Sequence, residues 1–440
     1  MTSRQIERVF LGTLLLAGCE APAPSTAGSP EAGTSPNASI LPAPLASETL
    51  DPMDAGAPFD ASDAAIRSLT ADERRRPSVP DGGAPPPVPF TPDTALPAEA
   101  SSTRDLSGLT LEAAWRWRDV PPPPRAPEVA ADGIKAAQRL TTLSWSIDLS
   151  ETGRLRIRFT SRALPLPGGS ELRARSDRYG AIVLWPNATD YRVIPPGALR
   201  TTLGERRVDV TPLATGTVTP DGEGRRLNLP VRKLEINSGL GSLRLEMARI
   251  PEAGEGGVVL CRALVELAGI DPRTSECQPG EVPLLASYAW HDGGGAALEV
   301  NAIAKRVDLA SNDMLVPPPG AKWSSSGLPT APGGVFLTRE EIAAFRSAPL
   351  DLPPPTAIGA PGEGFIAVNQ LDTLHYLLLD GVAVVAVPPV SERYVIGTTR
   401  GRYHVQWRTF LGEFIGPVIQ TEMPARLTLG DVDAGAPDGG

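Results

Sequence analysis

Apolar and polar positions alternate along much of the chain after residue 140, as in strands that bury one face. Leucine, tryptophan and isoleucine alternate with serine and aspartate over residues 143–149, and apolar and arginine positions alternate over 155–159. The intervening Glu151-Thr152-Gly153 is a turn sequence, so the two runs predict an antiparallel hairpin. The same pattern predicts three more hairpins, over 179–185 with 191–194, 234–236 with 243–247, and 282–290 with 297–303.

Helical spacing is rarer. Residues 256–268 carry a broad apolar face and are followed by Gly269 and Pro272, which end a helix. Thr338 and Glu341 form a capping box that predicts a second helix, and residues 196–203 predict a short one. Residues 109–117 fit either a helix or a strand that places Trp115 and Trp117 on one face.

Residues 364–429 read as a small all-β unit with strands at 365–369, 375–379, 383–387, 392–396, 403–409 and 425–429. Its expected core is Ile366, Val368, Leu377, Leu379, Val395, Val405 and Trp407. An Asp380-Gly381 turn, Pro388-Pro389 and Gly401-Arg402-Tyr403-His404-Val405 give it a loose resemblance to envelope β-sandwiches of the PEGA type, although the Pro-Glu-Gly-Ala motif is absent. The resemblance implies a binding or spacing module without catalytic residues.

The first hundred residues have a different composition. Residues 20–103 contain 12 acidic and 4 basic side chains, and Phe59 and Phe90 are their only aromatics. Such a segment buries too little apolar surface to offset the cost of ordering it, so we expect a disordered spacer reaching about 50 Å. It accounts for most of the net charge of −10, and the nearly neutral remainder argues against nucleic-acid binding.

These patterns predict an α+β fold, mainly antiparallel β, with a β-rich body, one or two helices and a small C-terminal β-sandwich. The expected segments are a signal peptide (1–18), a spacer (19–105), the body (106–348), a Pro-rich linker (349–363), the β-sandwich (364–430) and a disordered tail (431–440).

The start of the chain predicts its location. Two arginines and a short apolar run precede Leu16-Ala17-Gly18-Cys19, which resembles the lipobox of bacterial lipoproteins. The resemblance implies cleavage before Cys19 and a diacylglyceryl (palmitate-type) group on its thiol. It implies anchoring in the cell envelope, with the outer membrane, on its periplasmic face or the cell surface, as the expected site. The body resembles those of uncharacterised lipoproteins from high-GC Gram-negative bacteria, which implies no activity.

Cys261 and Cys277 remain as a pair inside the body. Their spacing suits a disulfide between a helix and the following loop, since the compartment is oxidising. A metal site is the alternative, but neither a Cys-x-x-Cys motif nor a nearby histidine supports it.

No catalytic motif stands out. The chain lacks Gly-x-Ser-x-Gly, Ser-x-x-Lys and His-Glu-x-x-His, and its three histidines are His291, His375 and His404. Gly254-Glu255-Gly256-Gly257 precedes a helix but lacks the Gly-Lys-Ser/Thr of a phosphate loop.

We therefore expect a lipid-anchored, non-enzymatic binding or scaffolding protein. It would have a membrane anchor, a protein or cell-wall partner, no nucleic-acid partner and no cofactor, metal or catalytic residues. Two alternatives stay open. A glycan binder would use exposed tryptophans such as Trp185, Trp290 and Trp323, and a hydrolase would need converging acids such as Asp177, Asp190 and Asp292.

Replacing the lipobox cysteine tests the anchor. Cys19→Ala should give an unlipidated precursor or a released form, because stable attachment requires the acyl chains. Metabolic labelling with a fatty-acid analogue measures it. Labelling that persists in the variant would contradict the assignment.

Overall fold

The computed structural model describes residues 88–90, 95–97, 99–118, 142–160, 166–186, 190–205, 208–325, 328, 334–345 and 364–430. Cys19 and the segments predicted as a signal peptide, a Pro-rich linker and a C-terminal tail lie outside these residues. No helix in the described part is long and apolar enough to cross a membrane.

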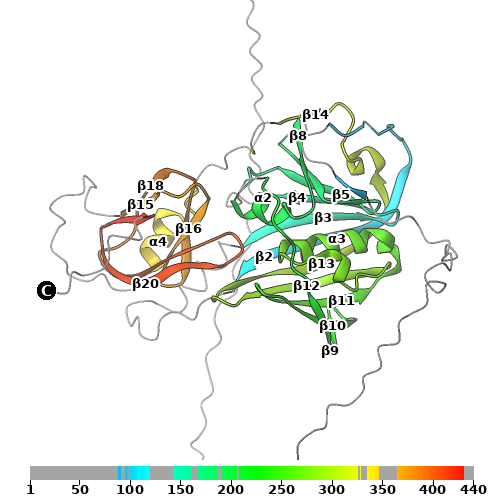
Figure 1. The fold of residues 1–440 in the computed structure, drawn as a ribbon. Coiled ribbons are helices and arrows are strands. Elements are labelled where there is room, and N and C mark those ends of the chain that lie inside the picture. The colour runs from blue at the N-terminus through cyan, green and yellow to red at the C-terminus, as the bar shows by residue number, and fades with distance from the viewer. Residues whose placement is uncertain are drawn as a thin grey trace, which may run out of the picture. The chain divides into compact units, whose positions relative to one another are not determined.

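The body is built on one 12-stranded sheet with the order β14-β8-β7-β5-β4-β3-β2-β13-β12-β11-β10-β9 (Figure 1). All its neighbours are antiparallel except the short β14–β8 pair. Its strands are β2 (Asp105–Trp117), β3 (Leu143–Ser150), β4 (Arg154–Phe159), β5 (Glu171–Arg175), β7 (Ala181–Leu184), β8 (Asp190–Ile194), β9 (Thr217–Arg226), β10 (Leu229–Asn237), β11 (Gly241–Arg249), β12 (Glu281–Trp290), β13 (Gly295–Ala310) and β14 (Lys322–Trp323).

The four predicted hairpins are confirmed as β3–β4, β7–β8, β10–β11 and β12–β13. Residues 109–117 form a strand, β2, at the centre of the sheet. It pairs with β3 on one side and β13 on the other. Its odd-numbered residues from Leu109 to Trp117 are buried, whereas Glu112 and Arg116 on the other face are exposed, so the strand reading of the alternation is the correct one.

One helix covers the sheet. α3 (Gly254–Leu267) packs on β12, β3, β4 and β5, and its apolar face joins the main core (Figure 1). The other helices are α2 (Leu199–Glu205), α4 (Arg339–Phe345) and the 3-10 turns η2 (Pro251–Ala253), η3 (Pro272–Thr274) and η4 (Ser311–Met314). The capping box of α4 is confirmed, because Thr338 and Glu341 exchange hydrogen bonds between side chains and backbone amides.

Two glycines explain how closely α3 approaches the sheet. A Cβ at Gly256 would meet the backbone of Ser150 in β3, and one at Gly257 would overlap the carbonyl oxygen of Glu281 in β12. The close packing of the helix on the sheet therefore explains the glycines at the start of α3. No phosphate-binding role is needed to account for them.

The spacer ends earlier than we expected. β1 (Val88–Pro89) already pairs with β6 (Arg178–Tyr179), the amide of Leu96 donates to the Tyr191 hydroxyl, and Glu99 pairs with Arg154. The predicted boundary at residue 105 is thus too late. Nothing in the sequence indicated this contact, because the described residues between 88 and 99 pack on the body without an alternating or helical pattern of apolar positions.

The C-terminal strands form a three-stranded sheet, β18-β15-β21, and a four-stranded sheet, β17-β16-β19-β20. Their bounds are β15 (Phe365–Asn369), β16 (His375–Leu379), β17 (Val382–Val387), β18 (Ser391–Val395), β19 (Gly401–Arg408), β20 (Phe414–Met423) and β21 (Arg426–Leu429). The unit has its own buried cluster, which contains five of the predicted core residues: Leu377, Leu379, Val395, Val405 and Trp407.

The expected face of β15 is wrong. Phe365 and Ala367 are buried, whereas Ile366 and Val368 are only half-buried. A strand shows alternation without showing which parity faces inward, and here the aromatic ring at position 365 occupies the core.

The other side of β16 contributes to the core of the body. Tyr376 lies 4.7 Å from Trp117 between ring centroids, and Phe410 stacks on Trp115 at 5.1 Å. The indole of Trp117 donates to the Phe410 carbonyl (2.6 Å), and that of Trp290 donates to the Leu411 carbonyl (2.8 Å). A separate fold for residues 364–430 remains a prediction, since the unit has both a core of its own and a face shared with the body.

The effect of Phe410→Ala distinguishes the two contributions. Phe410 is fully buried against the body, so the substitution should lower the free energy of unfolding of the full chain by about 3–5 kcal/mol. In an isolated fragment of residues 364–430 the same substitution should have a much smaller effect. Urea unfolding measures both, and a fragment that stays unfolded without the body would overturn its independence.

Candidate functional site

The predicted cysteine pair is joined in the structure. Cys261 in α3 and Cys277 in the following loop are bonded, with their Cα atoms 5.8 Å apart. No cluster of three or more histidine, cysteine or acidic side chains suited to a metal occurs among the described residues. The bridge fixes the C-terminal half of α3 to the segment that leads into β12.

The tryptophans do not form an exposed row. Trp115, Trp117, Trp145, Trp290 and Trp407 are buried, and Trp185 and Trp323 are half-buried against apolar clusters. Stacking on a sugar requires an open ring face. The glycan-binding alternative therefore finds no platform in these seven residues.

The acids of the hydrolase alternative lie apart. Asp177 and Asp190 lie at opposite ends of the strands. Glu171 at the start of β5 lies at the same end as Asp190, which begins β8, whereas Asp177 follows the other end of β5. Asp292 lies in the β12–β13 turn, and five strands lie between β13 and β8 in the sheet. Asp177 is also paired with Arg175 (2.5 Å). These three carboxylates cannot flank one bond as an acid–base pair must.

The histidines are held by structural contacts. His404 Nδ1 lies 3.1 Å from the buried Asp380, His375 is buried beside Thr373, and His291 Nε2 lies 3.1 Å from the Ser238 carbonyl oxygen. Only His291 is exposed, at a hairpin tip.

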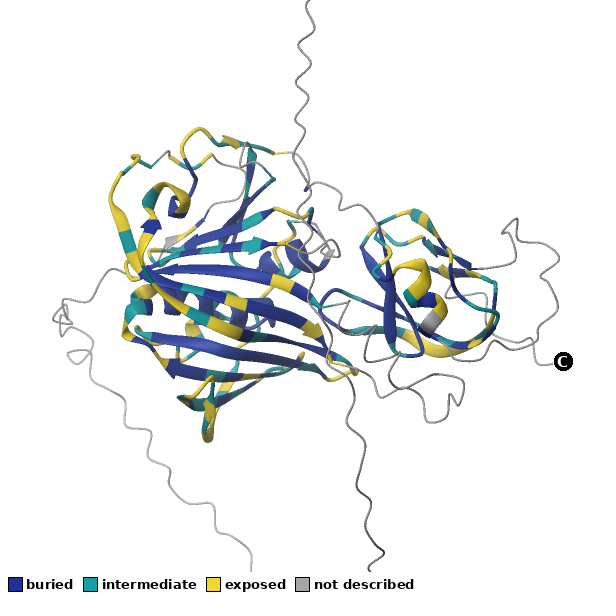
Figure 2. Cartoon of the chain, turned by 180° about the vertical axis from the view of Figure 1, so that it is seen from behind, coloured by how far each residue is buried: buried dark blue, intermediate teal, exposed yellow. Residues whose placement is uncertain are grey.

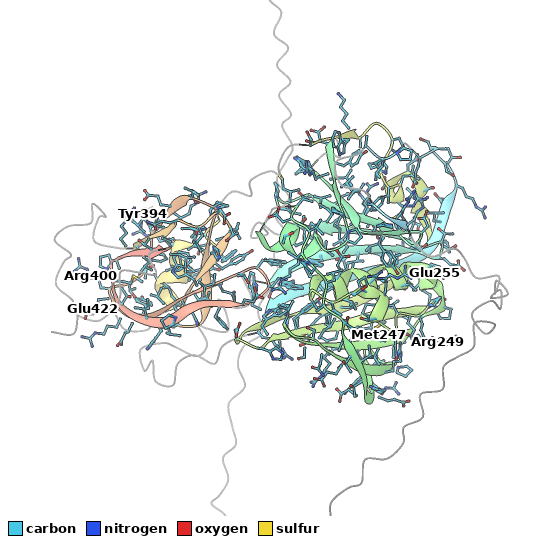
Figure 3. The ribbon with its side chains drawn as sticks, in the orientation of Figure 1. Met247, Arg249, Glu255, Tyr394, Arg400 and Glu422 are labelled. Atoms are coloured by element: carbon cyan, nitrogen blue, oxygen red, sulfur yellow. A yellow bond between two sulfur atoms is a disulfide. The ribbon has the colours of Figure 1, made fainter. Side chains whose placement is uncertain are left out.

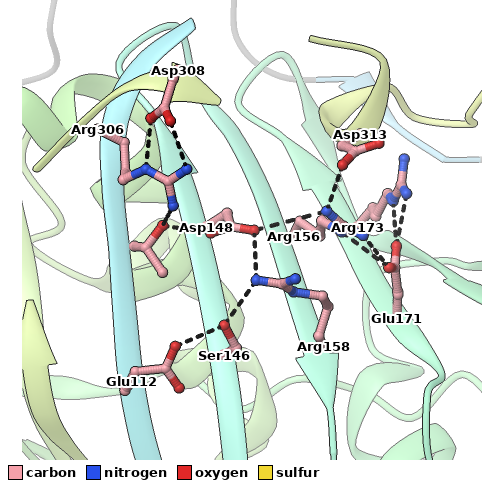
Figure 4. Close-up of polar contacts among 11 residues, drawn as sticks. Glu112, Ser146, Asp148, Arg156, Arg158, Glu171, Arg173, Arg306, Asp308 and Asp313 are labelled. Atoms are coloured by element: carbon pink, nitrogen blue, oxygen red, sulfur yellow. Dashed lines mark hydrogen bonds and ion pairs between the residues drawn. The ribbon is translucent and has the colours of Figure 1, made fainter. Parts of the chain in front are cut away.

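A polar network covers the face of the sheet opposite α3 (Figure 4). It arises from strand register: Thr110, Asp148, Arg156 and Arg173 are cross-strand neighbours on β2, β3, β4 and β5. The next row on this face contains Glu112, Ser146, Arg158 and Glu171, and the row between them, Leu111, Ile147, Ile157 and Leu172, belongs to the core.

The ionic groups of this network neutralise each other. Glu171 accepts from Arg156 (2.5 Å) and Arg173 (2.7 Å), and Asp148 accepts from Thr110 (2.8 Å) and lies 3.3 Å from Arg158 (Figure 4). Burial raises the pKa of Glu171, but the hydrogen bond from Arg156 and the charge of Arg173 outweigh it and hold that pKa below its ordinary value. A hollow of about 160 Å³ here is lined by three arginines and three aspartates. It has no excess charge to attract an ion, so we assign the network to stability.

A larger groove of about 370 Å³ lies where two strands of the sheet diverge. β13 pairs with β12 only as far as Glu299, but it continues along β2 to Ala310. β12 turns away at the bulge opposite Glu246 and Met247, next to Pro283, which has no amide hydrogen to donate. The groove is lined by Leu227, Leu229, Arg249, Ile250, Pro251, Glu252, Ala302, Ile303 and Lys305.

Apolar side chains form most of this groove. Ile303 lies opposite Leu111, in the same cross-strand row as Ile147, and therefore faces the α3 side and extends the core. Ile250 is buried, whereas Leu227 is 40% exposed and lies in the turn between β9 and β10. Figure 2 shows exposed residues at the tip of a hairpin that projects from the large sheet. Leu227 adopts a φ of 50°, a conformation that non-glycine residues rarely take.

Three charged residues line the groove. Lys305 pairs with Glu252 across it, while the other carboxylate oxygen of Glu252, Oε2, is buried with no hydrogen-bond partner among the described residues. Arg249 is exposed, and its side chain makes no ion pair or hydrogen bond to any described residue. It lies at the same end of the body as Glu255, which opens α3 (Figure 3). The groove thus combines an apolar floor, a strand edge and one uncompensated cation.

Comparison with known proteins gives no family. No protein-family model and no curated protein matches this chain. An uncharacterized conserved protein from Thermus thermophilus is 12% identical over 50% of this chain and 91% of that chain, with a TM-score of 0.26. The MucA/MucB complex of Pseudomonas aeruginosa matches at 10% identity over 48% of this chain and 55% of that chain, with a TM-score of 0.24. A putative outer membrane lipoprotein-sorting protein domain from Vibrio parahaemolyticus matches at 10% identity over 47% of this chain and 89% of that chain, with a TM-score of 0.24. Such low scores support no inference, so function has to be inferred from the chain's own geometry.

A buried carboxyl links α3 to α2. Glu266 is 5% exposed and accepts a hydrogen bond from the Gly197 amide (2.9 Å). Burial raises its pKa to about 7, against the lowering effect of the amides of Gly197 and Leu199. α2 in turn places Arg200 over the Trp290 ring and beside Glu413 of the C-terminal unit.

Glu266 should make stability depend on pH. Its pKa is higher in the folded chain than the ordinary 4.5, so its contribution is most favourable below pH 4.5 and is lost as pH rises through 7. The loss amounts to about 3 kcal/mol. Glu266→Gln keeps an acceptor oxygen and should be more stable than the unchanged protein at pH 8 but not at pH 4.5. Urea unfolding at both pH values measures this, with Glu255→Gln, an exposed position on the same helix, as control. An unchanged pH slope in Glu266→Gln would contradict the assignment.

Proposed function

We propose that this chain is a lipid-anchored, non-enzymatic protein of the bacterial cell envelope that binds a partner in the groove beside β13. The lipobox residues Leu16–Cys19 and the acidic, proline-rich spacer support the anchor and the envelope location. Acylation of Cys19 would hold the body at the membrane, with the spacer allowing it to reach components tens of ångströms away.

The observation that carries the binding proposal is the groove itself. Within the described part of the chain it is a hollow in the size range of ligand sites, and it presents apolar side chains together with an exposed, uncompensated arginine. An apolar surface left open at the side of an otherwise closed core is typical of an interaction site.

The non-enzymatic assignment is supported by where the candidate catalytic groups lie. The three acids fall on separate parts of the sheet, and the histidines contact backbone carbonyls or a buried aspartate. We also propose that the C-terminal unit supports the body and can bind a further envelope component, as its resemblance to PEGA-type modules implies.

Site-specific cross-linking in intact cells tests the binding site. A photo-reactive phenylalanine analogue at Leu227 should give one reproducible adduct, because this side chain lies at the groove mouth. The same analogue at Leu240 serves as a matched control, since Leu240 is 44% exposed in the turn between β10 and β11 and does not line the groove. Adducts of equal yield from both positions, or none from position 227, would refute the groove as the partner site.

A further inference from the structure

We propose that the groove binds an extended polypeptide segment of a partner protein, which adds to β13 as a new strand and places an acidic side chain against Arg249. This inference rests on the proposed function and specifies the partner's chemistry.

The first support is the unpaired edge of β13. Beyond Glu299 its backbone pairs with β2 on one side, and no described strand pairs with it on the other. From Asn301 to Asp308 only Ile303 and Arg306 are even half-buried. An unpaired strand edge presents a row of amide and carbonyl groups that an extended chain can satisfy, and this is how peptides add to exposed sheets.

The second support is the chemistry beside this edge. Ile303 and Leu229 are half-buried, Ile250 is buried, and Leu227 projects from a turn in a left-handed conformation. An added strand directs every second side chain toward one face, so alternate apolar side chains of the segment would lie on this floor. Leu227 and Asn228 both have positive φ because the two-residue hairpin turn between β9 and β10 requires it, and this turn leaves the Leu227 side chain exposed beside the groove.

The third support is charge. Lys305 is already neutralised by Glu252, whereas the side chain of Arg249 has no described partner, so the groove has one net positive charge to offer. An aspartate or glutamate of the segment would complement it.

An acyl chain fits these features less well. It would cover the apolar floor but leave the backbone groups of β13 and the charge of Arg249 without a partner. A polypeptide satisfies all of them, and for that reason we favour it over a lipid.

The experiment uses the full mature chain in detergent micelles and a display library of random dodecapeptides. Enriched peptides should share alternating apolar positions and one acidic residue. Successive backbone amides of an extended peptide point to opposite sides, so only every second amide can donate a hydrogen bond to β13. N-methylation of such an amide removes that hydrogen bond and should weaken binding by about tenfold or more. N-methylation at the positions between them should have little effect.

Variants locate the contact. Leu227→Asp should abolish binding, while Leu240→Asp should leave it unchanged. Arg249→Glu should weaken binding of the enriched peptide, and exchanging the peptide's acidic residue for lysine should restore it.

Three outcomes of the peptide and fatty-acid measurements would overturn the proposal, and a fourth concerns the chain's own residues 20–79. The three are N-methylation that has no effect at any position, enrichment of helical peptides only, or failure to enrich any peptide while a fluorescent fatty acid binds and Leu227→Asp abolishes its binding. In each case a cross-link from position 227 in cells would still support the groove as a partner site, so the two proposals fail separately. Peptide binding that disappears only when residues 20–79 are present would identify the chain's own spacer as the occupant, and would likewise overturn binding of a partner.

Discussion

The stacking of aromatic rings around Trp115 holds the two parts of the molecule in one core. This fully buried side chain of β2 stacks on Trp145 of β3 at 5.4 Å and on Phe410 at 5.1 Å, and Tyr288 of β12 lies 5.5 Å away. These contacts join the middle of the sheet to the C-terminal unit. The indole nitrogens of Trp115 and Trp145 have no hydrogen-bond partners among the described residues, so packing has to outweigh the cost of burying two donors. Loss of the Trp115 ring would remove packing at the centre of the sheet and the stacking contact with Phe410 of the C-terminal unit.

The groove follows from a second constraint, the unequal length of neighbouring strands. β13 has 16 residues and β12 has 10, and α3 approaches the start of β12 so closely that position 257 has to be glycine. β12 packs against the helix, while β13 beyond Glu299 pairs only with β2 among the described strands. The groove lies along this part of β13. The disulfide between Cys261 and Cys277 ties the helix to the chain entering β12 and should keep the separation of β12 from this part of β13 constant.

Alternation made most of the sheet predictable, because each of the four hairpins has one buried and one polar face. β9 and β20 escaped prediction since both are largely exposed and carry glycine and proline, so neither shows a buried face. Both faces of β15 carry apolar residues, so the sequence did not show which face is buried. The groove was beyond reach for another reason: Leu227, Ile250 and Ile303 come from three separate elements, and only the register of the strands brings them together. Arg249 gave no signal, because an uncompensated arginine looks like any other in a chain where arginine far outnumbers lysine.

Three other sheet edges contrast with the free edge of β13. β9 ends the large sheet with Pro220, Gly222 and Gly224, and β20 ends the four-stranded sheet with Gly416 and Pro417. Such residues interrupt pairing and protect an edge from association. β14 protects the opposite end of the large sheet by its length of only two residues. β13 contains no proline, its edge lies inside the sheet rather than at its end, and its one lysine is held by Glu252. Leu227 and Pro251 line the same groove as this edge, so pairing with the flat edge of another sheet is less favourable than pairing with a single extended chain. Such selectivity suits the binding role that we propose for the groove.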